Sequence, residues 1–206
     1  MDTLTINTYN ESAKEYEIKA KNYWDQNPRT FIDKFTNLVK GKVLDLGSGP
    51  GRDALIFKER GISVVCLDAS IAMINLCKEK KLEVVLGNFE SIPFENNYFF
   101  GVWAYTSLLH INKAKILEII NEIKRVLNDN GIFGLSLIEG EGEGYRDSTY
   151  VKKPRWFSFY KKEEIEIILK TLEFEIIYFE KIETDSKNYL NFISRKSLVS
   201  TKIHSH

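Results

Sequence analysis

Short apolar runs alternate with amphipathic stretches through the middle of this chain. Each run is five to seven residues long and is bounded by polar or glycine positions, as buried strands are. Between the runs, apolar residues recur every three or four positions, which is typical of one face of a helix. Alternating strands and helices predict right-handed crossovers and a mainly parallel sheet covered on both faces. We expect the five strands at residues 42–46, 63–67, 82–86, 99–104 and 132–138.

Helical patterns precede the first strand and separate the last two. Residues 12–21 and 28–39 both show mixed apolar spacing, and the Asn27-Pro28 pair separates one from the other. Aliphatic residues also recur at helical spacing over 116–127. The Asn130-Gly131 pair that follows is expected to stop this helix, because both residue types adopt the left-handed conformation of a helix C-terminus.

The last third of the chain has a different pattern. Glutamate and glycine dominate residues 139–145, and we expect this loop to be irregular. A helix at 161–172 precedes two strand-like runs, 174–182 and 189–194, whose connection is too short for a crossover helix. These final strands should therefore pair antiparallel at one edge of the sheet. The predicted fold class is α/β, a doubly wound seven-stranded sheet, mainly parallel, with an antiparallel C-terminal edge pair.

A glycine-rich turn carries the clearest chemical signal. An apolar strand ends at Leu46 and continues into Gly47, Gly49 and Gly51 before a helix begins. Glycines let the backbone approach a ligand where a Cβ would clash, and the helix directs its N-terminal amides to the same place. Asp68 ends the next strand, where its carboxylate can accept hydrogen bonds from both hydroxyls of a ribose. The turn therefore predicts a socket for a nucleoside-bearing cofactor.

Composition limits the classes of partner. The 206 residues include 29 Lys plus Arg and 29 Asp plus Glu, so no overall basic field attracts a nucleic-acid backbone. No apolar run approaches the roughly 18 residues of a membrane span, and we expect a cytoplasmic protein without membrane contact. Cys66 and Cys77 are expected to be small buried side chains rather than a disulfide or metal ligands. No metal is expected.

With these features in place, the chain resembles the class I S-adenosylmethionine-dependent methyltransferases. The resemblance covers roughly residues 9–196 and is strongest at 43–51, which looks like the first motif of that family. It implies a Rossmann-like fold. Further matches are Asp68 and residues 87–94, 103–110 and 128–133.

The length predicts a single domain, because 206 residues are enough for one substantial core, and the resemblance implies that it is a methyltransferase domain. Its expected parts are an N-terminal helical cap (1–40), a cofactor-binding core (41–139), a substrate loop (140–160), a C-terminal helix and β-hairpin (161–196) and a tail (197–206).

The resemblance implies how S-adenosylmethionine is held. The turn from Gly47 to Gly51 would wrap the methionine part, with Asp45 near the ammonium group and Asp68 on the ribose. Asn88 stands where the family usually has an aspartate facing the adenine amino group, and its amide oxygen can accept the same hydrogen bond. The positions implied to bind the cofactor are Asp45, Gly47, Ser48, Gly49, Pro50, Gly51, Asp53, Asp68, Ala69, Met73, Asn88, Phe89, Glu90, Ala104 and Tyr105.

The spacing of the turn also separates two cofactor classes. Nicotinamide and flavin enzymes place glycines after a strand as Gly-x-Gly-x-x-Gly, whereas this chain has Gly-x-Gly-x-Gly. Asp45 precedes the first glycine by two residues, and its charge suits a cationic ammonium better than a pyrophosphate, which it would repel. A methyl donor is favoured, and a dinucleotide is the alternative.

Two residues are candidates for a general base. Tyr105 ends the fourth strand, where open α/β sheets bind ligands beyond the carboxyl ends of central strands. His110 lies at the mouth of the predicted pocket, where a neutral imidazole can take a proton from a hydroxyl or amine. The alternative for His110 is a structural hydrogen bond or a place in the pocket lining.

The acceptor pocket is expected to involve the N-terminal helices and the glycine-rich loop. Tyr9 and Tyr16 either close over the cofactor or pack an amphipathic helix. Arginines near the loop suit an anionic group on the acceptor, whereas Phe157 and Phe159 are expected to pack. The candidate acceptor-binding residues are Tyr16, Tyr145, Arg146, Arg155, Trp156 and Tyr160.

The expected function is direct in-line methyl transfer from S-adenosylmethionine to a small-molecule acceptor, with S-adenosylhomocysteine as product. Relatives that methylate exocyclic amines of nucleic-acid bases usually carry Asn- or Asp-Pro-Pro-aromatic after the fourth strand, and this chain has no such sequence. It also has no Pro-Cys pair, which argues against attack on a pyrimidine by cysteine. Two alternatives stay open, an RNA (tRNA) methyltransferase of the same fold and a non-catalytic S-adenosylmethionine-binding protein.

Overall fold

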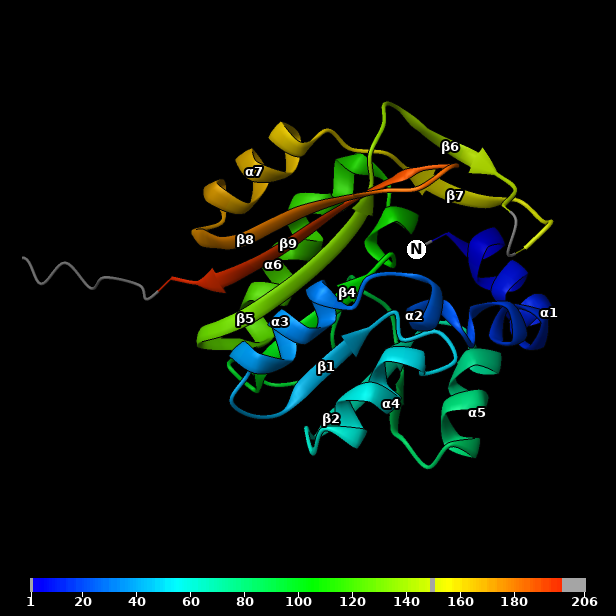
Figure 1. Ribbon diagram of the computed structural model, residues 1–206, viewed down its shortest axis with the longest axis horizontal. Helices are drawn as coiled ribbons and strands as arrows, with labels where there is room; N and C mark the ends of the chain where they lie inside the picture. Colours follow the sequence, from blue (N-terminus) through cyan, green and yellow to red (C-terminus); the bar gives the residue numbers. More distant parts are fainter. Residues whose placement is uncertain (1, 149–150, 198–206) are drawn as a thin grey trace, which may run out of the picture.

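Seven strands form one sheet at the centre of the molecule, with helices on both faces (Figure 1). The computed structural model describes residues 2–148 and 151–197. Strands pair parallel in the order β3-β2-β1-β4-β5, and β9 runs antiparallel between β5 and β8. The predicted fold class is confirmed. The strands of this sheet are β1 (Val43–Leu46), β2 (Val64–Asp68), β3 (Glu83–Leu86), β4 (Phe99–Tyr105), β5 (Leu127–Ile138), β8 (Phe174–Glu183) and β9 (Asn188–Lys196).

Two apolar layers hold the helices against the sheet. Side chains alternate along a strand, so the neighbours Val43 and Leu44 belong to opposite layers. Helices α3 and α4 cover one face around Trp103, and α6 and α7 cover the other. Full burial of one such side chain contributes about 1.5–3 kcal/mol. The helices are α1 (Thr3–Ala20), α2 (Tyr23–Gln26), α3 (Thr30–Leu38), α4 (Arg52–Glu59), α5 (Ile71–Glu79), α6 (Ile116–Val126) and α7 (Lys162–Thr171), with 3₁₀ turns η1 (Leu108–His110) and η2 (Lys113–Lys115).

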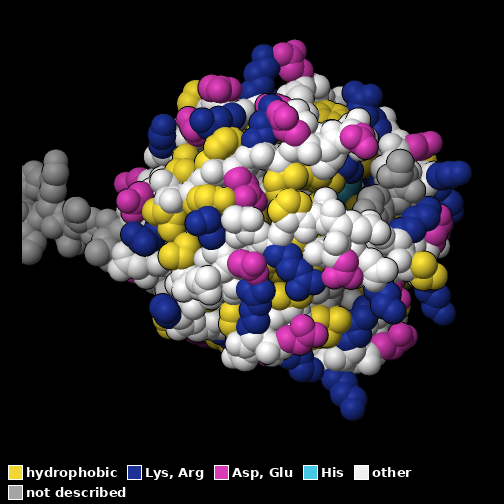
Figure 2. Space-filling view, in the orientation of Figure 1, with side chains coloured by type: hydrophobic (Ala, Val, Ile, Leu, Met, Phe, Trp, Pro, Cys, Tyr) yellow, Lys and Arg dark blue, Asp and Glu magenta, His cyan; other side chains and the backbone are white. Residues whose placement is uncertain are grey.

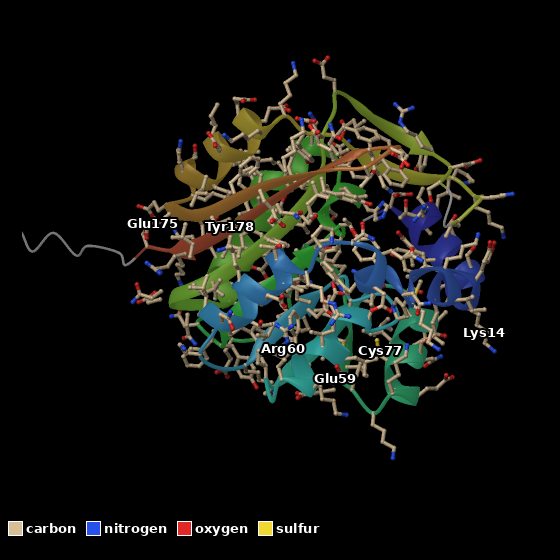
Figure 3. All side chains as sticks on the ribbon, in the orientation of Figure 1. Lys14, Glu59, Arg60, Cys77, Glu175 and Tyr178 are labelled. Atoms are coloured by element: carbon tan, nitrogen blue, oxygen red, sulfur yellow. The ribbon has the colours of Figure 1, made fainter. Side chains whose placement is uncertain are left out.

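Polar contacts fix α3, and α3 in turn holds α2. Arg60, labelled in Figure 3, donates to Thr36 Oγ1 at 2.6 Å and to Asp33 Oδ1 at 2.5 Å. Arg29 Nε, just before α3, donates to the carbonyl oxygen of Trp24 at 3.1 Å. Trp24 Nε1 in turn donates to Asp53 Oδ1 at 2.6 Å, so α2 is held beside the first turn of α4.

Helix α1 begins nine residues before the expected position 12. Its first turn is capped by Asp2, whose carboxylate accepts from Thr5 N at 3.0 Å. The helix packs through polar side chains: Asn10 Oδ1 accepts from Ser70 Oγ at 2.7 Å and from Ala72 N at 3.2 Å. Because Thr5 and other polar residues are buried on its inner side, apolar periodicity does not reveal where this helix starts.

The expectation of an irregular loop at 139–145 holds for residues 140–142 but was wrong for 143–145. Strand β6 (Glu143–Arg146) pairs antiparallel with β7 (Arg155–Ser158), and Figure 1 shows this hairpin beside α1. Thr5 Oγ1 accepts from Trp156 N at 2.9 Å, and Thr8 Oγ1 donates to Pro154 O at 3.0 Å. These contacts come from a helix far away in the sequence, so local strand propensity gave no sign of them.

The helix stop expected at Asn130-Gly131 was also wrong. Helix α6 ends at Val126 and the chain enters β5 at once. Asn130 takes φ 60° inside β5, where the register with β4 shifts between Phe99 and Gly101. The pair therefore marks a bulge in a strand rather than the end of a helix.

Basic and acidic side chains are interspersed on the face of the molecule shown in Figure 2. This face therefore presents no single basic patch of the kind that follows a phosphate backbone. Ser197 N donates to Glu173 O at 3.1 Å, so the first position of the expected tail is bonded to the fold. Residues 198–206 of that tail lie outside the described residues. Across 2–148 and 151–197, no helix has the length and apolar character needed to span a bilayer.

Candidate active site

Two adjoining pockets open at the carboxyl ends of the central strands. The first, here the glycine-loop pocket, includes Asp45, Gly49 and Asp68. The second, here the tyrosine pocket, includes Tyr23, Arg155 and other residues. The residues that line both pockets are Tyr9, Tyr16, Arg52, Tyr105, Thr106 and His110.

The glycine loop is held in one conformation by its surroundings. Gly47, Gly49 and Gly51 all have positive φ, at 75°, 53° and 81°. A Cβ on Gly47 would lie 2.4 Å from Ser107 Cβ, and Ser107 Oγ itself donates to Leu46 O at 2.7 Å. The position therefore admits only glycine, both for its backbone angle and for its space. At Gly47 and Gly49 the loop presents bare backbone to the pocket.

Asp68 is oriented by two backbone amides. Its Oδ2 accepts from Gly49 N at 2.9 Å and its Oδ1 accepts from Ser70 N at 2.8 Å. Burial raises the pKa of Asp68 above its ordinary value, although these hydrogen bonds oppose the shift. A carboxylate has about four lone-pair sites. Asp68 therefore retains acceptor capacity for two hydroxyl groups in the pocket.

Asp45 lies beneath the loop with an unsatisfied oxygen. Its side chain is 3% exposed, and no hydrogen-bond partner reaches Oδ2. Burial and the nearby Asp53 carboxylate raise the pKa of Asp45 well above its ordinary value. A buried acceptor without a donor costs about 1–3 kcal/mol. Oδ2 is therefore suited to a donor that a ligand brings, and a cationic one would also offset the charge.

Asp53 lines the same pocket but is already paired. Its oxygens accept from Trp24 Nε1 at 2.6 Å and Trp103 Nε1 at 2.9 Å, and both also accept from the Arg52 guanidinium. Burial alone would raise the pKa of Asp53, but the Arg52 charge and these donors lower it. The Arg52 guanidinium is thereby held 4.5 Å from the centre of the Tyr23 ring, in the wall between the pockets. Asp53 therefore positions Arg52 and has little acceptor capacity left for a ligand.

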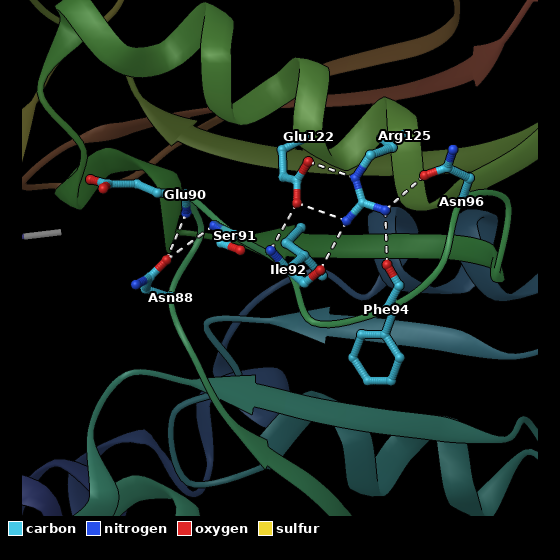
Figure 4. Close-up of polar contacts among 8 residues, drawn as sticks. All are labelled: Asn88, Glu90, Ser91, Ile92, Phe94, Asn96, Glu122 and Arg125. Carbon is cyan, nitrogen blue, oxygen red and sulfur yellow. Dashed lines mark hydrogen bonds and ion pairs between the residues drawn. The ribbon is translucent and has the colours of Figure 1, made fainter.

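Asn88 uses its side-chain oxygen to shape a turn (Figure 4). Its Oδ1 accepts from Glu90 N at 2.9 Å and from Ser91 N at 3.1 Å. Helix α6 secures the following segment, because Glu122 Oε1 accepts from Ile92 N at 2.9 Å. Both lone pairs of the Asn88 oxygen are thus occupied, which leaves none for an adenine amino group. The neighbouring Phe89 ring does reach the glycine-loop pocket.

Most of the positions expected to bind the cofactor do line the glycine-loop pocket. Gly51 instead caps α4 behind the loop, where a Cβ would lie 2.6 Å from Leu82. Ala104 is fully buried in the layer beneath α6. Of the expected cofactor positions, those absent from the pocket wall are Gly51, Ala69, Asn88, Glu90 and Ala104, and those present are Asp45, Gly47, Ser48, Gly49, Pro50, Asp53, Asp68, Met73, Phe89 and Tyr105.

Cys77, labelled in Figure 3, supports the loop from below. It is fully buried on α5, and its thiol donates to Gly49 O at 3.2 Å. Cys66 on β2 is likewise fully buried, and neither cysteine forms a disulfide. The interpretation of both cysteines as small buried side chains is confirmed.

His110 is neutral and its tautomer is defined. A carbonyl oxygen only accepts, so Nδ1 carries the proton and donates to Trp156 O at 2.5 Å. Nε2 then accepts from the Tyr9 hydroxyl at 2.7 Å, and that hydroxyl accepts from Arg155 at 2.6 Å. Burial and the Arg155 charge lower the pKa of His110 to about 3. The Tyr9 hydroxyl therefore occupies Nε2, the ring nitrogen of His110 that could accept a proton.

Tyr105 is held by a second hydroxyl. Its oxygen lies 2.6 Å from that of Tyr23, and its ring stacks on Trp103 with centroids 5.6 Å apart. Burial raises the pKa of both tyrosines. At neutral pH, Tyr105 is therefore a hydroxyl donor or acceptor rather than a phenolate base.

The residues expected to bind the acceptor separate into three groups. Tyr16 and Arg155 line the tyrosine pocket, whereas Tyr145 and Trp156 line a different hollow beside Glu90. Arg146 is exposed, with its guanidinium 5.3 Å from the centre of the Phe159 ring. Tyr160, 1% exposed, belongs to the apolar core, so its predicted place in an acceptor pocket was wrong.

Several pocket residues escaped the sequence analysis. Thr106 has φ 53° without being glycine, a strained position at the end of β4 of the kind that gathers at functional sites. Arg52 directly follows Gly51, and this position next to the glycine motif could have indicated that it lines the pocket. Lys187 comes from the β8–β9 turn and Tyr189 from the start of β9, where nothing in the local pattern pointed to a pocket. Phe157 both packs in the core, as expected, and lines the tyrosine pocket.

Comparison with known proteins places the glycine loop in a family. A model described as a methyltransferase domain matches residues 43–131. Over 132 residues, the chain is 34% identical to the sarcosine/dimethylglycine N-methyltransferase of Aphanothece halophytica. This match covers 57% of the chain and 47% of that relative, so the chain spans about half the relative's length.

Solved structures share the fold. An S-adenosylmethionine-dependent methyltransferase of Methanosarcina mazei matches with a TM-score of 0.71 and 20% identity, covering 79% of this chain and 96% of that one. The Burkholderia thailandensis 1,6-didemethyltoxoflavin-N1-methyltransferase, solved with S-adenosylhomocysteine and 1,6-didemethyltoxoflavin bound, matches with a TM-score of 0.64. Its identity is 16%, over 91% of this chain and 89% of that one. These findings identify a methyltransferase domain over residues 43–131, and the sheet order and the solved structures show a fold shared with S-adenosylmethionine-dependent methyltransferases.

Proposed function

We propose that this protein binds S-adenosylmethionine in the glycine-loop pocket and directs its methyl group to a small-molecule acceptor in the tyrosine pocket. The observation that carries the proposal is the fit of the donors and acceptors on the pocket wall. Asp45 Oδ2 is a buried acceptor without a partner, which suits the ammonium of the methionine part. Asp68 is oriented by Gly49 N and Ser70 N with capacity for two ribose hydroxyls.

Alignment and exclusion of water are the main tasks of the chain in this proposal. When bound, S-adenosylmethionine supplies a methyl group on a sulfonium, which is already activated for direct displacement. The wall shared by the pockets, with Tyr105 and Thr106 at the end of β4, is where acceptor and methyl group would meet in line. Such positioning supplies on the order of 7 kcal/mol or more without a covalent intermediate.

Proton removal contributes less to the rate than positioning does in this proposal. An acceptor that must lose a proton can pass it to the Tyr9 oxygen while the Tyr9 hydroxyl proton moves to His110 Nε2, 2.7 Å away. With a pKa near 3, His110 is a weak base. We therefore assign most of the rate to positioning and keep the Tyr9–His110 pair as a proton route for acceptors that acidify as the new bond forms.

The first test is calorimetric titration of the protein with S-adenosylmethionine, S-adenosylhomocysteine and NAD. The proposal expects micromolar binding of the first two and none of NAD. Binding of NAD alone, or of no nucleotide, would overturn it. A second test offers methyl-labelled S-adenosylmethionine with separated low-molecular-weight and RNA fractions of a cell extract. Label in the small-molecule fraction supports the proposal, whereas label in RNA alone identifies the nucleic-acid alternative.

A further inference from the structure

We infer that the tyrosine pocket contains an anion subsite, formed by Arg155 and Lys187, that takes a carboxylate or phosphate on a small methyl acceptor. Only the description of the ligand as a methyl acceptor rests on the proposed function. The subsite itself rests on how charge is distributed in the pocket. Three cationic side chains line it, Arg52, Arg155 and Lys187, and no aspartate or glutamate of the described chain does.

Arg155 is a buried guanidinium whose partners are neutral. It lies on β7 and is 3% exposed. One terminal nitrogen donates to the Tyr9 hydroxyl at 2.6 Å, and the other bonds to the hydroxyl of Ser148. Its Nε is buried with no partner. Every aspartate and glutamate lies within residues 2–148 and 151–197, and none of them forms an ion pair with Arg155.

Arg52 shows what a compensated arginine looks like in the same pocket. Both of its hydrogen-bonded nitrogens meet the Asp53 carboxylate, at 2.6 and 3.0 Å. Its charge is thus balanced within the protein. A buried ion without an opposite charge carries a desolvation penalty of several kcal/mol. Arg155 retains that penalty, and an anion brought by a ligand would offset it.

Lys187 places a second positive charge on the same pocket. It precedes β9 and lines the tyrosine pocket together with Arg155. Burial and the Arg155 charge lower the pKa of the Lys187 ammonium. The two cations therefore repel each other across a partly buried space, and an anion between them would be attracted to both.

The surroundings select a small organic anion. A guanidinium presents N–H donors in a planar fork that matches the oxygens of carboxylates and phosphates. The remaining wall is largely aromatic, including Tyr23, Phe157 and Tyr189, so the rest of the acceptor can be apolar. The pocket adjoins the glycine-loop pocket, which suits a compact molecule whose anion points away from the methyl group.

The test is calorimetric titration of the protein, with and without saturating S-adenosylhomocysteine, in a low-ionic-strength Tris-chloride buffer. The probes are propionate, methyl phosphate and the neutral isostere propionamide. Variants are Arg155→Gln and Lys187→Gln, and Arg146→Gln is the matched control on the same hairpin. We expect at least one anion to bind and propionamide not to bind. Arg155→Gln should weaken anion binding by roughly tenfold or more, Lys187→Gln should weaken it less, and Arg146→Gln should leave it unchanged.

The outcomes separate the subsite from the proposed function. Equal binding of propionate and propionamide, or unchanged anion binding in a folded Arg155→Gln protein, would overturn the inference. If Arg155→Gln does not fold, Lys187→Gln on the turn decides, and unchanged binding there overturns it. Anion binding without any S-adenosylhomocysteine binding would leave the subsite standing and refute the proposed function. A preference for propionate or methyl phosphate identifies which anion the subsite takes.

Discussion

The two pockets of this protein are built in opposite ways. The glycine-loop pocket takes more of its wall from one short stretch, residues 45–53, than from any other segment, and Asp68 at the end of the neighbouring strand lies beside it. The tyrosine pocket takes one or two residues from each of many separate elements, among them α1, α2, β4, η1, β7, the β8–β9 turn and β9. The first depends on backbone shape and the second on long-range packing. A pocket of the first kind is readable from a motif, whereas the second emerges only when the chain folds.

The sharpest test of the glycine-loop pocket is Gly47→Ala. The new Cβ would lie 2.4 Å from Ser107 at a φ of 75°. Strain and overpacking each cost about 1–3 kcal/mol, so S-adenosylmethionine affinity should fall by about 100-fold or more in a titration. Gly142→Ala is the matched control, with φ 76° and no atom within 4 Å of its Cβ. The affinity of the Gly142→Ala variant for S-adenosylmethionine should be unchanged. Equal losses of affinity in both variants would refute the role of the Ser107 contact.

Asp68→Ala should have the next largest effect. It removes a charged acceptor from two ligand hydroxyls and from Gly49 N, which is expected to weaken S-adenosylmethionine binding by about 1.5–3 kcal/mol. Titration calorimetry measures this, with the exposed Asp25→Ala as the carboxylate control. If affinity were the same in Asp68→Ala and wild type, the placement of the ribose would be wrong.

Burial of neutral His110 should make the stability of the protein depend on pH. The folded-state pKa of His110 is lowered to about 3 from an ordinary 6.5. Below 6.5 the unfolded chain binds a proton that the folded protein does not, so stability falls as pH falls between 6.5 and 3. The slope approaches about 1.4 kcal/mol per pH unit. Denaturant unfolding from pH 7 to pH 4.5 should show a shallower decline in His110→Gln than in wild type, and identical slopes would contradict this.

Asp45→Asn should separate binding from stability. The pKa of Asp45 is raised in the folded protein, so folding favours its protonated form. That stabilisation is present at acid pH and is lost as pH rises through the raised pKa. At neutral pH the neutral amide should therefore stabilise the ligand-free protein by about 1 kcal/mol while weakening S-adenosylmethionine binding. A thermal melt at pH 5 and pH 8 checks the sign, because the gain should be larger at the higher pH.

The smallest effect is expected at a residue that the sequence analysis assigned to the acceptor. Tyr145 is 49% exposed and donates to Asp2 Oδ1 at 3.1 Å, outside the tyrosine pocket. Tyr145→Phe should leave the KM for the acceptor within about twofold and the Tm within about 1 °C. A large rise in KM would move the acceptor site to the hollow that Tyr145 lines with Trp156.

The fold followed from the sequence where constraints were local. Strand runs, the short β8–β9 connection and the glycine turn each depend on neighbouring residues, and the sheet that they predicted is the one observed. The prediction was wrong at β6–β7 and at Asn130 because distant partners determined the conformation there: α1 for the hairpin, β4 for the bulge. Helix α1 began earlier than expected because its buried side is polar.

The sequence alone determined the sheet, the glycine loop and the residues Asp45 and Asp68 on its two flanks. Only the tertiary structure decided which charges are balanced. It pairs Asp53 with Arg52 and two indoles, and it buries Arg155 among hydroxyls without a carboxylate. Patterns that determine strands, helices and turns are local and can be recognised in the sequence. The partner of a buried charge comes from a distant segment that only folding brings close.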